Sequence, residues 1–347
     1  MHPAAAVLVV SALCTAIAAA PAPQISRLPL FNINDPFSCG STQAADPTVE
    51  QIIAARVKDL EQAASGLSSL SETGRFPVAQ ATGDRQVAVH WHKILANDTV
   101  QGGNYDDSAI SRQIEVLNEQ YNSAGFVFSL ASSETVTNAD WYRRAGPGSA
   151  QQTEMKNALR KGDAASLNFY SVGFEQIDTP GLLGYATFPS SYSSAPKDDG
   201  VVFYSYAVPG GPLGENYSLG KVNTHEAGHW LGMFHTFQGP LGGLLGGCVP
   251  PGDSVQDTPP VNEPTFGCPT EPVRNCPLSP LPAQTTNIMG KSVIYFKLRA
   301  SDSEADTMST CEHGSHATLD YTYDRCKGDI TPGQVARMQA QWEQYRA

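Results

Sequence analysis

One short segment, THEAGHWLGMFH at residues 224–235, constrains this chain more than any other part of its sequence. The segment holds three of the eight histidines in the 347-residue chain. His225 and His229 are four positions apart, so a helix would place both imidazoles on one face, about one turn apart. Gly232 follows where a helix can end in a left-handed turn, which lets His235 approach from another side. The spacing therefore predicts three imidazoles around one metal ion.

Glu226 lies beside these expected ligands without being needed as one. Three neutral imidazoles leave one position of a tetrahedral zinc open for water. Imidazole also suits copper and nickel, and zinc is preferred here for its chemistry and availability. Zinc lowers the pKa of its bound water and polarises a carbonyl group, and a carboxylate can accept the proton of that water. The segment thus supplies the parts of a hydrolytic site.

The start of the chain predicts secretion. The apolar run AAAVLVVSALCTAIAAA ends in small residues, and Ala16-Ile17-Ala18 is an A-x-A cleavage pattern. The run is too short to span a bilayer comfortably, and no second apolar segment follows it. We expect a signal peptide at residues 1–18, an extracellular protein and no membrane partner. Residues 19–84 are interpreted as a propeptide or amino-terminal arm with a Ser/Gly/Thr-rich end.

Charge and cysteine usage agree with that compartment. The chain has 22 basic and 34 acidic residues, a net charge of −12, which argues against a nucleic-acid partner because phosphate binding needs a cationic surface. Secretion makes disulfides favourable. Six cysteines remain after the signal peptide: Cys39, Cys248, Cys268, Cys276, Cys311 and Cys326. Asn97 and Asn216 begin glycosylation acceptor triplets.

Helical and strand patterns are mixed before residue 220, and turn residues dominate after His235. Asp46 is a predicted N-cap, and Thr331 with Gln334 predicts a capping box for the last helix. Helices are expected from residue 46, over 107–122 and from residue 331. Strands are expected at 85–95, 125–130, 166–174, 181–189 and 200–208.

The histidine segment also carries a family resemblance. HExxHxxGxxH is the zinc motif of the metzincins. Four other stretches make the resemblance more specific: GGCVPPGDSVQDTPPVNEPTFGCP, ITPGQVARMQAQW, GFVFSL and LLGYATFP. With them, the chain resembles the pappalysin-type metalloproteases, and among these the secreted fungal enzymes. The resemblance covers residues 85–347 with one interruption.

This resemblance implies an α+β catalytic domain of two subdomains separated by a cleft. A mixed, twisted sheet and helices, including the zinc helix, would lie above the cleft. An irregular, disulfide-linked lower subdomain would follow His235. The resemblance also implies an edge strand at the cleft near residues 183–186, which a peptide substrate would extend by backbone hydrogen bonds. An ordinary sheet edge is the alternative for these four residues.

The resemblance further implies roles for the cysteines. Cys248 would pair with Cys276 and Cys268 with Cys326, although sequence alone permits three pairings of four cysteines. Some relatives use a cysteine in the amino-terminal arm to cover the zinc of the latent form. Cys39 is the candidate latency thiol, since a thiolate would fill the open zinc position. A third disulfide or an idle thiol is the alternative.

A calcium site is a further implication. Asp253, Asp257 and Thr258 lie where relatives bind a structural calcium ion, and clustered oxygen ligands suit that ion. A turn rich in Asp and Pro is the alternative interpretation of the same residues.

The chain departs from the family after Met289. Met289 in TTNIMG fits the methionine turn that supports a metzincin zinc site, and relatives continue with a pattern like Asn-x-Met-Asp-Tyr. Here residues 290–319 separate Met289 from Asp320-Tyr321. Removing these 30 residues restores the pattern and shortens the Cys276–Cys326 separation from 50 to 20 positions. Tyr321 is the candidate hydrogen-bond donor to the developing oxyanion.

We interpret residues 290–319 as a translated intron. Gly-Lys-Ser can be encoded with a GTAAGT donor sequence, Leu-Asp can be encoded with a terminal TAG, and splicing there regenerates an Asp codon. A genuine loop insertion is the alternative, but long structureless loops inside compact domains are uncommon.

The sequence thus predicts a secreted, monomeric zinc endopeptidase that hydrolyses peptide bonds in protein or peptide substrates. Zinc-bound water activated by Glu226 would be the nucleophile. The alternative is a catalytically silent extracellular binding protein on a metzincin scaffold. The interrupted methionine turn favours this alternative, and the intact Glu226 argues against it.

Overall fold

The computed structural model describes residues 39–41, 46–67, 84–238, 247–249, 251–262, 268–269, 271–274, 276, 279, 282–289 and 323–347. The expected signal peptide, residues 68–83 of the amino-terminal arm and the 290–319 insert lie outside these residues, so the boundaries of these segments stay predictions. Within the described part, no helix has the length and apolar character needed to cross a membrane.

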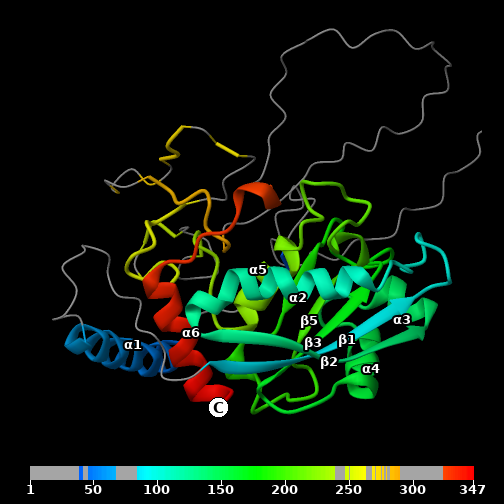
Figure 1. The fold of residues 1–347 in the computed structure, drawn as a ribbon, viewed down its shortest axis with the longest axis horizontal. Helices are drawn as coiled ribbons and strands as arrows, with labels where there is room; N and C mark the ends of the chain where they lie inside the picture. Colours follow the sequence, from blue (N-terminus) through cyan, green and yellow to red (C-terminus); the bar gives the residue numbers. More distant parts are fainter. Residues whose placement is uncertain are drawn as a thin grey trace, which may run out of the picture. The chain divides into compact units, whose positions relative to one another are not determined.

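A five-stranded sheet forms the centre of the fold (Figure 1). Its strands are β1 (Arg85–Leu95), β2 (Phe126–Thr137), β3 (Ser166–Val172), β4 (Gly184–Ala186) and β5 (Val201–Tyr204). Their order is β2-β1-β3-β5-β4, with β4 antiparallel at the edge and the other pairs parallel. The helices are α1 (Pro47–Leu67), α2 (Ser108–Tyr121), α3 (Ala139–Arg144), α4 (Ala150–Leu159), α5 (Lys221–Trp230) and α6 (Pro332–Tyr345). The predicted α+β class with a mixed sheet is confirmed.

The sequence patterns located most of these elements, with errors at the edge of the sheet. The strand predicted over 181–189 is only three residues long, and the one predicted over 200–208 ends at Tyr204 in a 3₁₀ turn, Ser205–Ala207. The patterns also missed α3 and α4, which are too short or too polar to show a clear apolar period. The capping box of Thr331 and Gln334 is present at α6.

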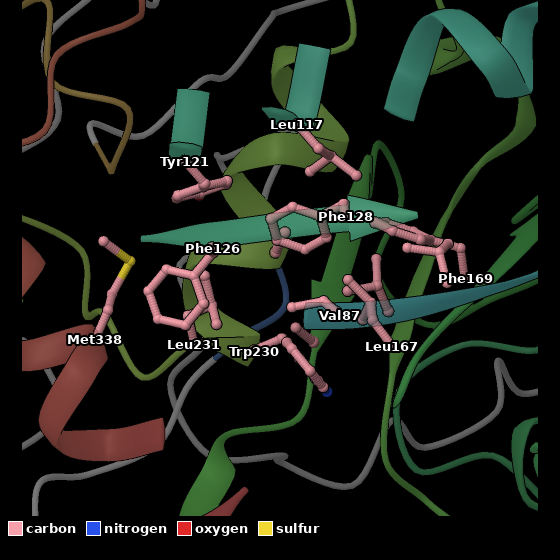
Figure 2. Close-up of a cluster of buried hydrophobic side chains, with 14 of the residues drawn as sticks. Val87, Leu117, Tyr121, Phe126, Phe128, Leu167, Phe169, Trp230, Leu231 and Met338 are labelled. Atoms are coloured by element: carbon pink, nitrogen blue, oxygen red, sulfur yellow. The ribbon is translucent and has the colours of Figure 1, made fainter. Parts of the chain in front are cut away.

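Two apolar cores lie on opposite faces of the sheet, because alternate strand residues point to opposite sides. Phe169 of β3 belongs to one core and its neighbour Tyr170 to the other. The larger core packs against α2, α5 and α6, and Figure 2 shows Tyr121 of α2 above its strands. The smaller core includes Tyr142 of α3 and Met155 of α4. The histidine segment on α5 is therefore held against the larger core.

Helix α1 of the amino-terminal arm packs against α6 (Figure 1). Asp46 caps it, since its Oδ1 accepts the N–H of Thr48 at 2.8 Å. Ile53 is buried, and both oxygens of Glu50 accept hydrogen bonds from the Arg337 guanidinium of α6 at 2.7 and 2.8 Å. The arm is therefore docked on the domain through apolar and ionic contacts.

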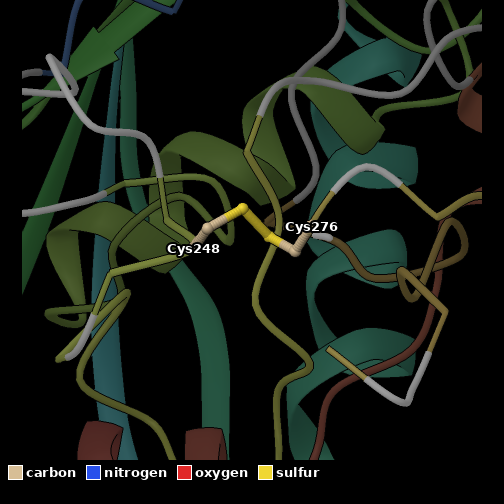
Figure 3. The surroundings of a disulfide bond; sticks show 2 residues. All are labelled: Cys248 and Cys276. Atoms are coloured by element: carbon tan, nitrogen blue, oxygen red, sulfur yellow. A yellow bond between two sulfur atoms is a disulfide. The ribbon is translucent and has the colours of Figure 1, made fainter. Parts of the chain in front are cut away.

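Cross-links replace regular structure in the lower part of the domain. In the described stretches between residues 236 and 331, the longest regular element is the 3₁₀ turn Asp324–Cys326. Cys248 is joined to Cys276 (Figure 3) and Cys268 to Cys326, the pairing that the resemblance implies. Disulfides restrict the unfolded chain and so stabilise segments that have few backbone hydrogen bonds of their own.

Candidate active site

Three imidazole nitrogens converge at the end of α5. Nε2 of His225 lies 3.1 Å from Nε2 of His229 and 3.2 Å from Nε2 of His235, and the last two are 3.2 Å apart. All three side chains are buried. Nitrogen ligands of a tetrahedral zinc at its usual bond lengths would be about 3.3 Å apart. The triangle therefore has the size that fits such an ion.

The outer ring nitrogens show that the inner ones are acceptors. His225 Nδ1 donates to Ile288 O at 2.7 Å, and His229 Nδ1 donates to Met233 O at 2.8 Å. Each Nε2 then carries a lone pair, and two lone pairs 3.1 Å apart repel each other. Burial lowers the pKa of His229 to about 4, so this imidazole is neutral near pH 7. A cation between the nitrogens relieves the repulsion, so the donor set fits a metal ion.

The local backbone explains how a short segment produces this triangle. His225 and His229 lie one turn apart on α5, which ends at Trp230. Gly232 then adopts a φ of +98°, in the left-handed region that glycine enters without steric cost. The reversal returns the chain toward the helix and brings His235 to the same point. The predicted helix–turn geometry of the motif is present.

Met289 lies directly against α5, where the resemblance places a methionine turn. Its side chain is fully buried, and its N–H donates to Asn287 Oδ1 at 3.0 Å. A Cβ atom on Gly228 would be 2.6 Å from Met289 Sδ. Glycine inside the HEAGH sequence therefore permits the close approach of the turn that also carries Ile288. Tyr321, the oxyanion candidate, lies outside the described residues.

The Glu226 carboxylate is buried between α5 and the edge strand β4. A Cβ atom on Gly184 of β4 would be 2.8 Å from Glu226 Cγ, so the absence of a side chain there makes room for the carboxylate. Burial raises the pKa of Glu226 to about 7, although hydrogen bonds from Cys39 and Ser41 and the charge of Lys327 act to lower it. A carboxyl group with such a pKa can accept and return a proton near neutral pH.

The arm segment Cys39–Ser41 lies in the site and forms a β-bridge with the edge strand β4. Gly40 N donates to Gly184 O at 2.9 Å, and Cys39 pairs with Gly184 as a parallel bridge. Cys39 Sγ lies 3.3 Å from Glu226 Oε2. The thiol and the three histidine ligand atoms all lie within 4.8 Å of one another. The arm therefore covers both the metal ligands and the carboxylate.

Two side chains that the sequence did not point to interact with this site. Ser41 Oγ donates to Glu226 Oε2 at 3.1 Å and accepts from Ala186 N of β4 at 2.7 Å. Lys327 is buried and is one of the charged neighbours of Glu226 and Cys39. The position of Ser41, two residues after Cys39 in an extended arm, could have suggested its role. Lys327 gave no such signal, because its proximity depends on the fold.

The three calcium candidates do not share one arrangement. Both carboxylate oxygens of Asp253 accept from Thr258 Oγ1, at 2.7 and 2.8 Å. Asp257 instead accepts from Thr331 Oγ1 at 2.6 Å and from Gly333 N at 2.8 Å, so it stabilises the start of α6. Each carboxylate thus has protein partners, and calcium binding stays a prediction.

The two glycosylation candidates differ in accessibility. Asn97 is exposed in the loop after β1, whereas Asn216 is half-buried and Ser218 of its triplet is buried. Asn97 is therefore the more accessible acceptor. Cys311 lies outside the described residues.

Comparisons with known proteins agree with the site. The sequence model of the peptidase family described as pregnancy-associated plasma protein-A matches residues 179–299. An extracellular metalloprotease of Pyricularia oryzae is 31% identical over 323 residues, covering 93% of this chain and 94% of that protein. Extracellular metalloprotease 1 of Coccidioides posadasii is 33% identical over 317 residues, covering 89% of this chain and 95% of that protein.

Solved structures show the same fold. A mutant of Tannerella forsythia promirolysin superimposes with a TM-score of 0.57 at 22% identity, covering 88% of this chain and 94% of that chain. Mature mirolysin of the same organism, in complex with a cleaved peptide, gives a TM-score of 0.52 at 23% identity, covering 76% and 97%. At these identities the likeness extends to the fold alone.

Proposed function

Because this chain belongs to the pappalysin family of metalloendopeptidases, we propose that Glu226 is the general base of its peptide hydrolysis. The three histidines of the motif would hold zinc, the ion that best fits their number, size and buried lone pairs. Zinc, when bound, acts as a Lewis acid that lowers the pKa of water and polarises a carbonyl group. The observation that carries the proposal is the buried Glu226 carboxylate beside the nitrogen triangle.

The protein's own residues supply the remaining parts of this reaction. An extended substrate would pair with the edge strand β4, as Gly40 does with Gly184 O at 2.9 Å. Glu226 would take a proton from the attacking water and return it to the leaving amine. Ile288 O and Met233 O keep two imidazoles in the orientation that the ion needs.

The same geometry supports latency in the form that contains the arm. Cys39 and Ser41 lie where substrate would lie, and the Cys39 thiolate could take the fourth position around the ion. The promirolysin structure matches a larger share of this chain than the mature form does, which supports residues 19–84 as a propeptide. Secretion, with a signal peptide at 1–18, agrees with the extracellular metalloproteases that this chain resembles.

A digestion experiment tests the catalytic proposal. The full chain, activated by limited proteolysis, should degrade casein, lose activity with a chelator and recover it with zinc. Glu226→Gln should lower turnover by about 10³-fold or more without loss of bound metal. Equal activity of this variant and the wild type would refute the assigned base. Purified protein that contains no transition metal and gains no activity from added zinc would refute the metal site.

The proposed intron needs its own comparison. The chain and a variant lacking residues 290–319 should be expressed side by side. We expect the shortened chain to be secreted in higher yield and to be more active, because its Met289 is followed by Asp320-Tyr321. Unbroken transcripts through this segment in cells that secrete active protease would show that the insert is genuine.

A further inference from the structure

One arginine of α6 holds the turn that joins the helix of the histidine motif to His235. Arg337 Nε donates a hydrogen bond to Gly232 O at 2.9 Å. Its guanidinium carbon also lies 4.5 Å from the centre of the Phe234 ring, within the range of a cation–π interaction. These two contacts lie on either side of Met233 in the chain, directly before His235.

The residue between the two contacts orients a metal ligand. Met233 O accepts the hydrogen bond of His229 Nδ1 at 2.8 Å, and His235 follows two positions later. A shift of the turn would therefore move two of the three imidazoles relative to His225. Metal binding is sensitive to such shifts, because the groups that hold the ligands set their orientation toward the ion. Arg337 is thus linked to the nitrogen triangle through the backbone of the turn.

Helix α6 packs directly against this turn. A Cβ atom on Gly232 would be 2.4 Å from Gln341 Cγ, and Gln341 lies one helical turn after Arg337 on the same face of α6. Arg337 is 1% exposed and Gln341 is 4% exposed. Because the guanidinium is charged and buried, its hydrogen bond to Gly232 O is stronger than one between neutral groups in water.

The outer nitrogens of the same guanidinium bind the amino-terminal arm. Nη1 of Arg337 donates to Glu50 Oε2 at 2.7 Å, and Nη2 donates to Glu50 Oε1 at 2.8 Å. A carboxylate bound in this bidentate way fixes the plane of a guanidinium, because both hydrogen bonds depend on it. The plane in turn sets the direction of the Nε–H group toward Gly232 O. One rigid group therefore holds both the arm helix α1 and the turn.

We propose that Arg337 is a positioning residue of the metal site, and that Glu50 orients it so that docking of the arm helix α1 strengthens metal binding. The inference rests on the proposed zinc site and adds a connection between the arm and that site that does not involve Cys39. Coupling between two binding events is reciprocal, so bound zinc also strengthens the docking of α1.

The zinc affinity of the unprocessed chain tests the proposal without any need for turnover. Every protein carries Cys39→Ala, so that the thiol makes no contribution to metal binding. Competition with a chromophoric chelator should give a zinc Kd about tenfold or more weaker for Arg337→Met, which loses all three hydrogen bonds. Arg337→Lys should also weaken binding, because one ammonium group cannot reproduce the planar fork. Glu50→Ala should give a smaller loss, because the bond to the turn remains.

Two controls separate positioning from a general loss of stability. Arg56→Ala breaks the exposed pair with Glu343 between the same two helices, and it should leave the zinc Kd unchanged. Met155→Ala creates a cavity in the smaller core, on the opposite face of the sheet. It should lower the melting temperature and leave the zinc Kd unchanged. All affinities are measured at a temperature at which circular dichroism shows each variant to be folded.

The possible outcomes are distinct. A zinc Kd of Arg337→Met equal to that of the Cys39→Ala background overturns the positioning role and leaves the zinc site intact; Arg337→Lys decides in its place if the Met variant does not fold. An unchanged Kd in Glu50→Ala overturns the connection to the arm. An equal loss in Met155→Ala assigns the effect to stability and overturns the proposal. A background protein that binds no zinc refutes the proposed metal site, and the inference with it.

Discussion

The Ser41 hydroxyl donates a hydrogen bond to Glu226 Oε2 at 3.1 Å and accepts one from the N–H of Ala186, on the edge strand β4, at 2.7 Å. A residue of the amino-terminal arm thus contacts the proposed base and the edge strand β4 at once. Cys39 reaches the same carboxylate at 3.3 Å. Two side chains of the arm therefore contact the Glu226 carboxylate, and the Cys39 thiol also lies within 4.8 Å of the three histidine nitrogens.

Substitution in the arm should release latency. Cys39→Ala removes the thiol from the metal ligands, and we expect the unprocessed chain to gain about tenfold or more in activity on a short fluorogenic peptide. Ser41→Ala should give a smaller gain, because it removes about one charge-assisted hydrogen bond. Ser194→Ala, in an exposed loop, is the control. Unchanged activity in the Cys39→Ala, Ser41→Ala double variant would contradict the latency proposal.

Breaking the Glu50–Arg337 pair should loosen the arm. Arg337 is buried and makes both hydrogen bonds to Glu50, so Glu50→Ala leaves a buried cation without its carboxylate. We expect a loss of about 3 kcal/mol in the unfolding free energy of the unprocessed chain. Thermal or denaturant unfolding measures it.

Arg56→Ala is the matched comparison for that change. Arg56 pairs with Glu343 at 3.7 Å on the exposed side of the same two helices. Its loss should cost less than about 1 kcal/mol. Equal costs for Glu50→Ala and Arg56→Ala would show that the buried pair does not anchor the arm.

A side chain on Gly184 should disturb the base without removing the metal. The Cβ atom of Gly184→Ala would lie 2.8 Å from Glu226 Cγ and 3.1 Å from Oε1, so the carboxylate must move. Because small misplacements of a catalytic group are costly, we expect kcat to fall by about tenfold or more. Metal analysis should show the wild-type content, since the three atoms nearest to this Cβ all belong to Glu226. Normal kcat would show that the strand yields instead.

Asp253 should make stability depend on pH. Burial raises its pKa from an ordinary value near 3.8 to about 7, so the folded state binds the proton more tightly than the unfolded state does. This contribution is complete below about pH 4 and is lost as the pH rises through 7. The melting temperature of Asp253→Asn relative to the wild type should therefore increase between pH 4 and pH 8.

Calcium gives the opposite result at the same residue. A bound ion would stabilise the ionised carboxylate and raise the melting temperature of the wild type with calcium concentration. Asp253→Asn would then be less stable than the wild type at pH 8 in calcium. Titration of calcium into both proteins decides between a protonated, Thr258-bonded Asp253 and a calcium ligand.

Local sequence patterns predicted the structure correctly where the residues that form a feature are close together in the chain. The spacing of His225 and His229, the left-handed turn at Gly232 and the caps of α1 and α6 depend on residues within one or two helical turns. Backbone geometry links such residues directly, so these features were predicted. Short elements such as β4 lacked enough residues to show a period, and their bounds were wrong.

The sequence by itself therefore determined the metal-binding residue types, their helix–turn spacing and the family. It did not determine which distant groups interact with Glu226. Ser41, Gly184 and Lys327 are 185, 42 and 101 positions away from it in the chain. They meet there because β4 is the edge of the sheet, the arm pairs with it, and the cross-linked segment after Cys326 runs along the methionine turn. Packing between distant segments has no local sequence signal, so the surroundings of the base came from the tertiary structure.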